Sequence, residues 1–371
     1  MYAKSIENWF IIRADANVNI GIGHVIRCLA LAEWLTEQGI VPVLLSKFSN
    51  DFIESKLASL GGELVLLNES LNEPDKKYQH SSWLKGTEED DAKVSTNAIE
   101  ELIQFEYKKN PLFIMVDHYS IGAPWEEQLK EIAPILVVDD LSDRKHNCNW
   151  LVDQTYGKTS GDYNHLVPST AKLFIGPKYG LLRKEFSQIT SQPPRVFKQK
   201  NIKVLISLGG IDKNNDACKV LSYLSQYKLI TEIAITIVTS SANPNLKKLT
   251  SYISTLTYVN LLVDVNDMAT LFKTYDICIG AAGSTSWERC AMSMPTLCVV
   301  IAENQETIAD NLEAANAIIN LGLIENLTST ELLYQFEKVC QNEDFYTQLS
   351  HDAYALCDGL GCGRIIKEII N

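Results

Sequence analysis

The chain has 371 residues, of which 46% are hydrophobic, and its formal net charge is −13. This length suffices for a large core in two domains, and the negative charge argues against binding to nucleic acid or to an anionic membrane surface. No apolar run reaches the roughly 18 residues of a membrane helix, and the polar start lacks the apolar segment of a signal peptide, so we expect a cytoplasmic protein without stable membrane association. The nine cysteines, without CxxC spacing, indicate buried reduced thiols rather than disulfides or a zinc site.

Short apolar runs alternate with helical patterns in the first half, which predicts parallel strands connected by helices. The candidate strands are FIIRAD (10–15), VPVLLS (41–46), ELVLLN (63–68), LFIMVDH (112–118), ILVVDD (135–140) and KLFIGP (172–177). Asp117, His118 and Tyr119 end one strand, and Asp139 and Asp140 end another. Polar side chains at strand carboxyl ends point towards a ligand, although turn and capping roles are equally ordinary for each residue alone.

The first candidate strand runs through a loop with two glycines into an amphipathic helix, within residues 10–33. Gly21 and Gly23 allow the backbone to bend sharply, and His24 stands where the helix begins. The loop does not fit a dinucleotide fingerprint, because Ile26 replaces the third glycine of GxGxxG. The positive end of a helix disfavours imidazolium, so His24 is expected to be neutral and is a candidate general base. The alternative is a residue that only satisfies the helix start.

Two polar stretches interrupt the α/β pattern. Residues 68–92 are acidic, and we interpret them as an excursion or lid-like loop whose EEDD run is a solvated surface. Residues 187–200 are polar and contain two adjacent prolines, which suits a linker. We therefore expect an N-terminal α/β domain over residues 1–190 and a C-terminal α/β domain over residues 200–371.

The second half repeats the α/β pattern. Asp212 is placed to cap the helix that follows the first strand and its paired glycines, and no short repeat is evident. The candidate strands are NIKVLIS (201–207), EIAITIVTS (232–240), YVNLLVDV (258–265), YDICIG (275–280) and TLCVVIA (296–302), and the last helix contains RIIKEII (364–370). The two halves together predict two doubly wound domains facing a cleft.

A small-residue loop precedes a helix in the segment GAAGSTSWERCAMSMP (280–295). Gly283, Ser284, Thr285 and Ser286 offer backbone N–H groups and hydroxyls that suit a pyrophosphate. Glu288, one turn later, could accept both hydroxyls of a ribose. Thr285 and Glu288 also fit a capping box, which is the purely structural alternative.

Two amides follow the next strand. Asn304 and Gln305 could bind phosphate or sugar oxygens, or simply cap a helix. The chain has no DxD pair to bridge a diphosphate through a metal and no HExxH spacing. We therefore expect no metal or other cofactor, and helix ends and backbone donors would have to neutralise a leaving diphosphate.

These motifs resemble the UDP-sugar hydrolases of pseudaminic acid biosynthesis (the PseG type), which are similar in architecture to two-domain GT-B glycosyltransferases such as MurG. The resemblance covers nearly the whole chain outside the start before Trp9 and residues 68–92. It rests on RADANVNIGIGHVIRCLALA, VDHYS, VDDLSDRKHNCNWLVDQTY, YNHLVP, GPKYGLLRKEF, SLGG, SSANPNLKKL, GAAGSTSWERCAMSMP and AENQET.

The resemblance implies a GT-B-like fold and the hydrolysis of UDP-2,4-diacetamido-2,4,6-trideoxy-β-L-altropyranose to UDP and free sugar, with C–O cleavage and inversion. It assigns the general base to His24 and a further catalytic role to Tyr119, and it matches Glu288 to a ribose-binding glutamate. The substrate-binding positions it implies are Arg13, Asp15, Gly21, Gly23, Arg183, Gly209, Gly210, Gly283, Ser284, Thr285, Glu288, Asn304 and Gln305. The implied setting is a monomer that acts in surface polysaccharide synthesis and flagellin glycosylation.

Two other functions remain open. A GT-B glycosyltransferase would use the same nucleotide site but transfer the sugar to an acceptor, although no apolar or basic surface helix for such an acceptor is evident in the first half. A non-catalytic nucleotide-sugar binding protein would keep Glu288 and the loop before it, but it would have no use for His24. UDP release without an acceptor separates the three.

Overall fold

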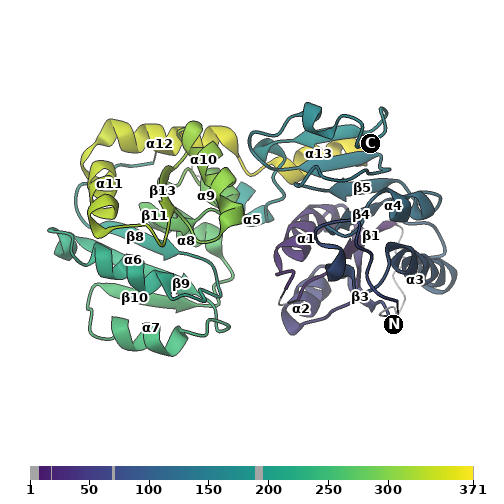
Figure 1. Ribbon diagram of the computed structural model, residues 1–371, viewed down its shortest axis with the longest axis horizontal. Coiled ribbons are helices and arrows are strands. Elements are labelled where there is room, and N and C mark those ends of the chain that lie inside the picture. The colour runs from purple at the N-terminus through teal and green to yellow at the C-terminus, as the bar shows by residue number, and fades with distance from the viewer. Residues whose placement is uncertain (1–7, 18, 69–71, 189–194, 371) are drawn as a thin grey trace. The chain divides into compact units, whose positions relative to one another are not determined.

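The computed structural model describes residues 8–17, 19–68, 72–188 and 195–370, except for the side chain of Asn304. The chain divides into two compact units (Figure 1). The first consists of Met1–Lys184 together with Leu360–Asn371, and the second of Glu185–Gly359.

The first unit is built on a seven-stranded parallel sheet with the strand order β3-β2-β1-β4-β5-β6-β7. Its strands are β1 (Asn8–Ala14), β2 (Ile40–Ser46), β3 (Glu63–Leu66), β4 (Ile114–Asp117), β5 (Ile135–Val138), β6 (Trp150–Asp153) and β7 (Lys172–Ile175). The helices and helical turns are α1 (Gly23–Thr36), α2 (Asp51–Ser59), η1 (Ser81–Leu84), α3 (Glu88–Glu101), η2 (Leu102–Tyr107), α4 (Ala123–Leu129), η3 (Ser160–Tyr163), η4 (Pro177–Tyr179) and α13 (Gly361–Ile369). α5 (Lys184–Gln188) runs from this unit into the second.

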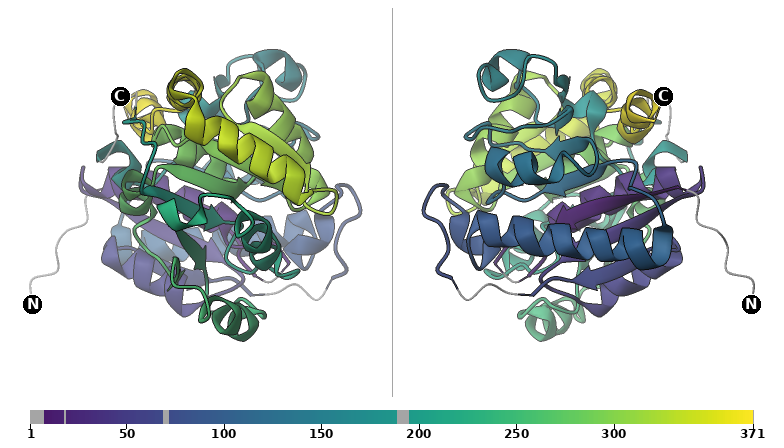
Figure 2. Two further views of the ribbon diagram at one scale, coloured as in Figure 1. Left: turned by 90° about the vertical axis from the view of Figure 1, so that its left-hand side faces the viewer. Right: turned by 90° about the vertical axis from the view of Figure 1, so that its right-hand side faces the viewer.

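The first sheet is buried on both faces, as its nearly continuous apolar strands predict. Along β1, Phe10 and Ile12 pack in a core with residues of α1, α2 and α13, whereas Trp9 and Ile11 pack in a second core with residues of α3 and α4. The two sets of helices accordingly lie on opposite sides of the strands in Figure 1, and the right panel of Figure 2 shows α3 crossing in front of the sheet. Alternation along one strand therefore assigns each helix to its face.

The second unit has a six-stranded parallel sheet with the order β10-β9-β8-β11-β12-β13. The strands are β8 (Ile202–Ser207), β9 (Ile233–Thr239), β10 (Val259–Val263), β11 (Ile277–Ala281), β12 (Thr296–Val300) and β13 (Ile319–Leu323). The helices and turns are α6 (Asp216–Leu224), η5 (Ile230–Glu232), α7 (Leu246–Ile253), α8 (Met268–Thr274), α9 (Thr285–Ala291), η6 (Glu303–Gln305), α10 (Glu306–Ala314), α11 (Ser329–Gln341) and α12 (Glu343–Leu356). Both sheets are thus doubly wound, as expected; β6 and β13 are the strands that the sequence pattern missed.

The end of the chain belongs to the first unit, which corrects the expected division at residue 200. Helix α13 places Cys362 and Ile365 in the same core as α1. A Cβ atom on Gly361 would lie only 2.3 Å from the carbonyl oxygen of Gly180, so only glycine allows the helix to approach η4 this closely. The apolar stripe of this helix, although predicted, does not reveal which sheet it covers.

The acidic run in residues 68–92 is not simply a solvated surface. It forms the first turn of α3, where Thr87 accepts a hydrogen bond from the backbone N–H of Asp90 and the carboxylates complement the helix dipole. Glu88 and Asp91 are buried, and only Glu89 is largely exposed. Asp91 accepts two hydrogen bonds from Arg13, at 2.7 and 3.0 Å. A partner 78 residues away leaves no local trace in the sequence, which is why the run resembles an ordinary charged surface.

All nine cysteines are free thiols, and all but Cys218 are buried, as expected for reduced core residues. Burial raises the pKa of Cys278 and of Cys298 to about 11, so both remain protonated at neutral pH. Among the described residues, no helix combines the length and apolarity that crossing a bilayer requires.

Candidate functional site

The polar side chains of the first unit gather at the carboxyl ends of three adjacent strands, β1, β4 and β5. The strand order reverses between β1 and β4, and ligands of doubly wound sheets bind outside such a reversal. Register places Ala14, the last residue of β1, beside Asp117, the last residue of β4. The loop after β1 therefore begins next to Asp117 and leads directly into α1.

His24 lies in the first turn of α1 and is fixed by Asp117. Its Nδ1 lies 2.6 Å from Oδ1 of Asp117, and the side chain is 10% exposed. The described part of the chain offers no partner to Nε2, and this atom is not sealed from water. A carboxylate at Nδ1 selects the tautomer that carries its proton there, which leaves the lone pair of Nε2 free to accept a proton. Gly21, which precedes this turn at a φ of +80°, adopts a conformation that favours glycine.

Asp117 in turn is clamped by Arg27, one turn further along α1. Nε and Nη2 of Arg27 donate to the two carboxylate oxygens at 2.5 and 2.7 Å. Burial by itself would raise the pKa of Asp117, but the charge of Arg27, followed by that of His24, holds it well below its usual range. Asp117 thus remains ionised at any working pH. Arg27 was not predicted from the sequence, although its spacing of three residues from His24 on one helix face is a usable signal.

Tyr119, the second catalytic candidate, lies against the ring of His24. Their ring centroids are 4.6 Å apart with the planes at 86°, an edge-to-face contact. The Tyr119 hydroxyl donates to Asp140 at 2.5 Å, and Asp140 also accepts from Nη1 of Arg27 at 2.7 Å. Burial, reinforced by Asp140, raises the pKa of Tyr119 far above its usual value. The phenol is therefore a proton donor to Asp140 and a wall for His24 rather than a base.

Arg13 and Asp15 lie beneath this edge and not on it. Both side chains are completely buried and pair with each other at 2.8 Å. Arg13 also binds Asp91, while Asp15 accepts from the backbone N–H of Lys47 at 2.8 Å. The expected contact of these two residues with substrate is not available in this structure, because neither has exposed surface. Arg183 is half-buried in the segment that precedes α5.

In the second unit, paired glycines follow β8. Gly209 has a φ of +92°, and the carbonyl of Gly210 accepts hydrogen bonds from the hydroxyls of Thr239 and Ser240 at 3.1 and 2.8 Å. Asp212 accepts from two backbone N–H groups at the start of α6, which confirms its capping role. The turn is therefore held from both sides by short polar contacts.

The loop before α9 does not form the capping box that was the alternative for Glu288. Helix α9 begins at Thr285, and Ser284 makes no side-chain cap. The Thr285 hydroxyl instead accepts from Nη1 of Arg289 at 3.0 Å, and the Ser286 hydroxyl accepts from Nη2 at 3.0 Å. Glu288 is half-buried in the first turn.

Gln305 lies beside this loop. Its Oε1 accepts from the backbone N–H of Ile301 at 3.2 Å, and its Nε2 lies 4.0 Å from the position of a Cβ on Gly283. Both expected roles of Gln305, a local cap and a neighbour of the loop, are therefore compatible with its position. Asn304 lies in the same turn, η6, but its side chain is outside the described part of the structure.

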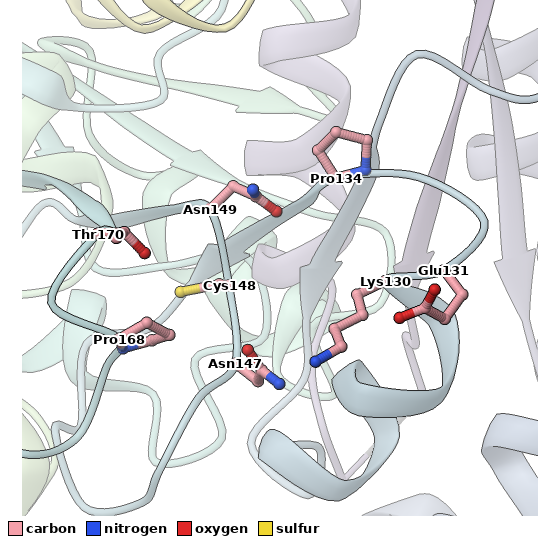
Figure 3. Close-up of a pocket in the computed structure, with 8 residues that line it drawn as sticks. All are labelled: Lys130, Glu131, Pro134, Asn147, Cys148, Asn149, Pro168 and Thr170. Atoms are coloured by element: carbon pink, nitrogen blue, oxygen red, sulfur yellow. The ribbon is translucent and has the colours of Figure 1, made fainter.

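A separate pocket lies at the opposite edge of the first sheet, next to the amino ends of β5 and β6 (Figure 3). Its wall consists of Lys130, Glu131, Pro134, Asn147, Cys148, Asn149, Pro168 and Thr170. Burial raises the pKa of the Cys148 thiol, which makes it a poor nucleophile. Ligands of parallel sheets bind at the other edge, so the candidate site remains the one around His24.

No family model matches the chain. It is 28% identical over 302 residues to the UDP-2,4-diacetamido-2,4,6-trideoxy-β-L-altropyranose hydrolase of Campylobacter jejuni, covering 81% of this chain and 94% of that protein. It is 24% identical to the spore coat polysaccharide biosynthesis protein SpsG of Bacillus subtilis, with 95% of each chain covered. Among solved structures, MurG of Acinetobacter baumannii superposes with a TM-score of 0.63 over 98% of this chain and 99% of that chain, at 14% identity.

The solved structure shows the fold, and the two doubly wound sheets agree with the GT-B-like architecture that the sequence predicted. The sequence similarity to SpsG covers 95% of this chain and therefore extends through both units. The chain is therefore a protein of the GT-B fold that resembles the UDP-sugar hydrolases of the PseG type over most of its length.

Proposed function

We propose that this protein hydrolyses UDP-2,4-diacetamido-2,4,6-trideoxy-β-L-altropyranose, or a closely related UDP-linked diacetamido sugar, to UDP and the free sugar. The observation that carries the proposal is the pair formed by His24 and Asp117. Asp117 holds one nitrogen of the imidazole, and the other has no partner among the described residues. The similarity to the Campylobacter jejuni hydrolase supplies the class of substrate.

In this mechanism, Nε2 of His24 takes a proton from a water molecule that attacks the anomeric carbon opposite to UDP. The bond between that carbon and the diphosphate oxygen breaks, and the configuration inverts. Asp117 stabilises the imidazolium that forms, because it remains ionised and accepts from Nδ1. Arg27 keeps Asp117 in position through two hydrogen bonds.

The second unit would hold the nucleotide. Backbone N–H groups of Gly283, Ser284 and Thr285 are suited to the diphosphate, and Glu288 to the ribose hydroxyls. The assignment of Glu288 rests on its position in the first turn of α9, directly after this loop. Free thiols throughout the chain suit a reducing cytoplasm, and since His24, Arg27 and Asp117 come from one chain, the base requires no second copy.

Turnover in water enriched in oxygen-18 tests the proposal. Incubation of the purified protein with the UDP-sugar and no acceptor should release UDP, with the label in the sugar and none in UDP. The proton spectrum recorded immediately after cleavage should show the inverted anomer first. Label in the β-phosphate would overturn the C–O mechanism, and release that depends on an added acceptor would favour the glycosyltransferase. Binding without release would favour a sensor.

A further inference from the structure

The aromatic rings of three residues cluster beside His24. Tyr119 contacts it edge-on at 4.6 Å, and Trp83 lies at 6.2 Å in a similar orientation. Trp83 stacks on Tyr119 at 5.6 Å with an interplanar angle of 26°, and His80 lies 4.4 Å from Trp83 and 5.4 Å from Tyr119. We call Trp83, His80 and Tyr119 the aromatic wall. Two of its three members come from residues 68–92.

The segment that carries His80 and Trp83 is anchored at several points. Leu84, the last residue of η1, is buried in the core, and Nζ of Lys47 donates to its carbonyl at 2.5 Å. The Ser120 hydroxyl donates to the carbonyl of His80 at 2.5 Å. These contacts fix both rings beside His24 before any ligand binds, which lowers the entropic cost of binding. Residues 80–84 are thus anchored beside His24 in this structure, and the lid-like role expected for residues 68–92 stays a prediction.

Trp83 differs from Trp9 and Trp125 in its polar edge. The indole N–H groups of Trp9 and Trp125 both donate at 3.0 Å, to the carbonyl of Lys109 and to Asp91. Trp83 is half-buried, and its N–H has no hydrogen-bond partner within the described ranges and is not enclosed. A tryptophan with one apolar face packed and a free N–H at its edge is typical of a ligand site.

The charged side chains around the aromatic wall are paired with one another. Arg27 binds Asp117 and Asp140, and Arg144 pairs with Asp139 at 2.8 Å. Burial lowers the pKa of His80, although Asp143 opposes the effect, so this ring is neutral at pH 7. The wall therefore suits an uncharged group with apolar C–H faces rather than a phosphate.

We propose that Trp83 and His80 bind the sugar ring of the substrate, with the C–H face of the pyranose on the indole and the indole N–H donating to an acetamido oxygen. This inference rests on the proposed function and assigns sugar selectivity to residues 80–83. It places the anomeric carbon near His24, because Trp83 lies 6.2 Å from the imidazole and His80 packs against Trp83 and Tyr119. Sugars without an acetamido group lose the hydrogen bond to Trp83.

Kinetics of two substitutions test the proposal. Trp83→Ala should raise KM for the UDP-sugar about tenfold, through loss of one stacking surface and one hydrogen bond, while kcat and the Kd of UDP change less than about twofold. Trp83→Phe keeps an aromatic ring but not the N–H, so its KM should lie between the values of the wild type and of Trp83→Ala. Phe105→Ala is the matched control, because its ring is 66% exposed on η2 of the same unit, and it should leave all three constants unchanged.

Binding of the free diacetamido-trideoxy sugar separates this inference from the proposed reaction. Saturation-transfer NMR should detect the sugar on the wild type and lose most of the signal with Trp83→Ala. If the wild type binds the sugar in this way but never releases UDP, the proposed hydrolysis is refuted, whereas sugar binding by the aromatic wall is supported. An unchanged KM in both Trp83 variants would contradict sugar binding by the aromatic wall. A lower kcat at unchanged KM would also contradict it, since the rings would then only position His24.

Discussion

The ends of the central strands are built differently in the two units. In the first unit, the side chains at the strand ends bind one another: His24, Arg27, Asp117 and Asp140 form one connected set of contacts between 2.5 and 2.7 Å. In the second unit, the buried Arg289 donates hydrogen bonds to the hydroxyls of Thr285 and Ser286 in the loop and first turn of α9. What remains at the second edge is chiefly backbone. The first edge is therefore suited to fixing protonation states, and the second to binding an anion through N–H groups.

The largest effect is expected when the proposed general base is removed. His24→Asn keeps polarity and approximate size, and it should lower kcat by about two to four orders of magnitude, because a general base acts in the transition state. UDP affinity, which we propose is set in the second unit, should stay within about twofold. Steady-state kinetics and calorimetric titration with UDP measure the two quantities. His351→Asn is the control, since its side chain is 63% exposed, and a near-normal kcat for His24→Asn would remove the imidazole from the mechanism.

The next largest effect is expected when Asp117, which holds His24 in position, is replaced. Asp117→Asn removes the fully buried one of the two carboxylates that pair with Arg27, so the free energy of unfolding should fall by about 3 kcal/mol, and kcat should fall as well. Urea unfolding provides the first value. Glu127→Gln removes the carboxylate of a largely exposed pair with Lys130 and should cost less than about 1 kcal/mol. Equal losses in the two variants would contradict the importance assigned to the buried pair.

A third effect depends on pH. Burial raises the pKa of Asp153, at the end of β6, from 3.8 to about 6, and its Oδ2 lies 2.9 Å from the Tyr163 hydroxyl. Between these values the folded chain binds more protons than the unfolded chain, so this group stabilises the fold fully below pH 4 and loses that contribution as pH rises through 6.

Asp153→Asn imitates the protonated carboxyl at every pH. Relative to the wild type, this variant should therefore gain stability between pH 4.5 and 8, by at most about 3 kcal/mol. Urea unfolding of both proteins across that range measures the difference. A difference that is constant with pH would show that Asp153 is already ionised throughout, and Asp162→Asn on the exposed η3 turn serves as the control.

A smaller effect concerns the second edge. Glu288→Gln should weaken UDP binding about tenfold, and 2′-deoxy-UDP, which binds the wild type less well, should lose most of that penalty in the variant. Glu331→Gln provides the control, because Glu331 also lies in the first turn of a helix of this unit. A changed melting temperature with unchanged UDP affinity would return Glu288 to a structural role.

The smallest expected effect is none at all. If helix ends and backbone N–H groups neutralise the leaving diphosphate, excess EDTA should leave the rate of UDP release unchanged. Rates measured with EDTA and with added magnesium provide the comparison. Activity that returns only with magnesium or manganese would contradict the assignment of the second edge as a backbone site.

Much of this architecture could be predicted, because local patterns carry it. The apolar run of β1, the glycines that follow it and the stripe of α1 place His24 at a helix start, and the strand-end position of Asp117 indicates the same edge. The clamp by Arg27 and the burial of Asp91 depend on partners 90 and 78 residues away. Such pairings arise from the fold and leave no periodic signal, so charge runs and single arginines are ambiguous in sequence.

The return of α13 to the first unit has a consequence for how the chain folds. Because residues 360–370 emerge from the ribosome only after the whole of the second unit, the core around α1 lacks Cys362, Ile365 and Ile366 until those residues have been made. The second unit, continuous in sequence, can fold while it is being made, whereas the first must wait with an exposed apolar face beside Leu29 and Leu35. The unit that carries the candidate base is therefore the last to mature.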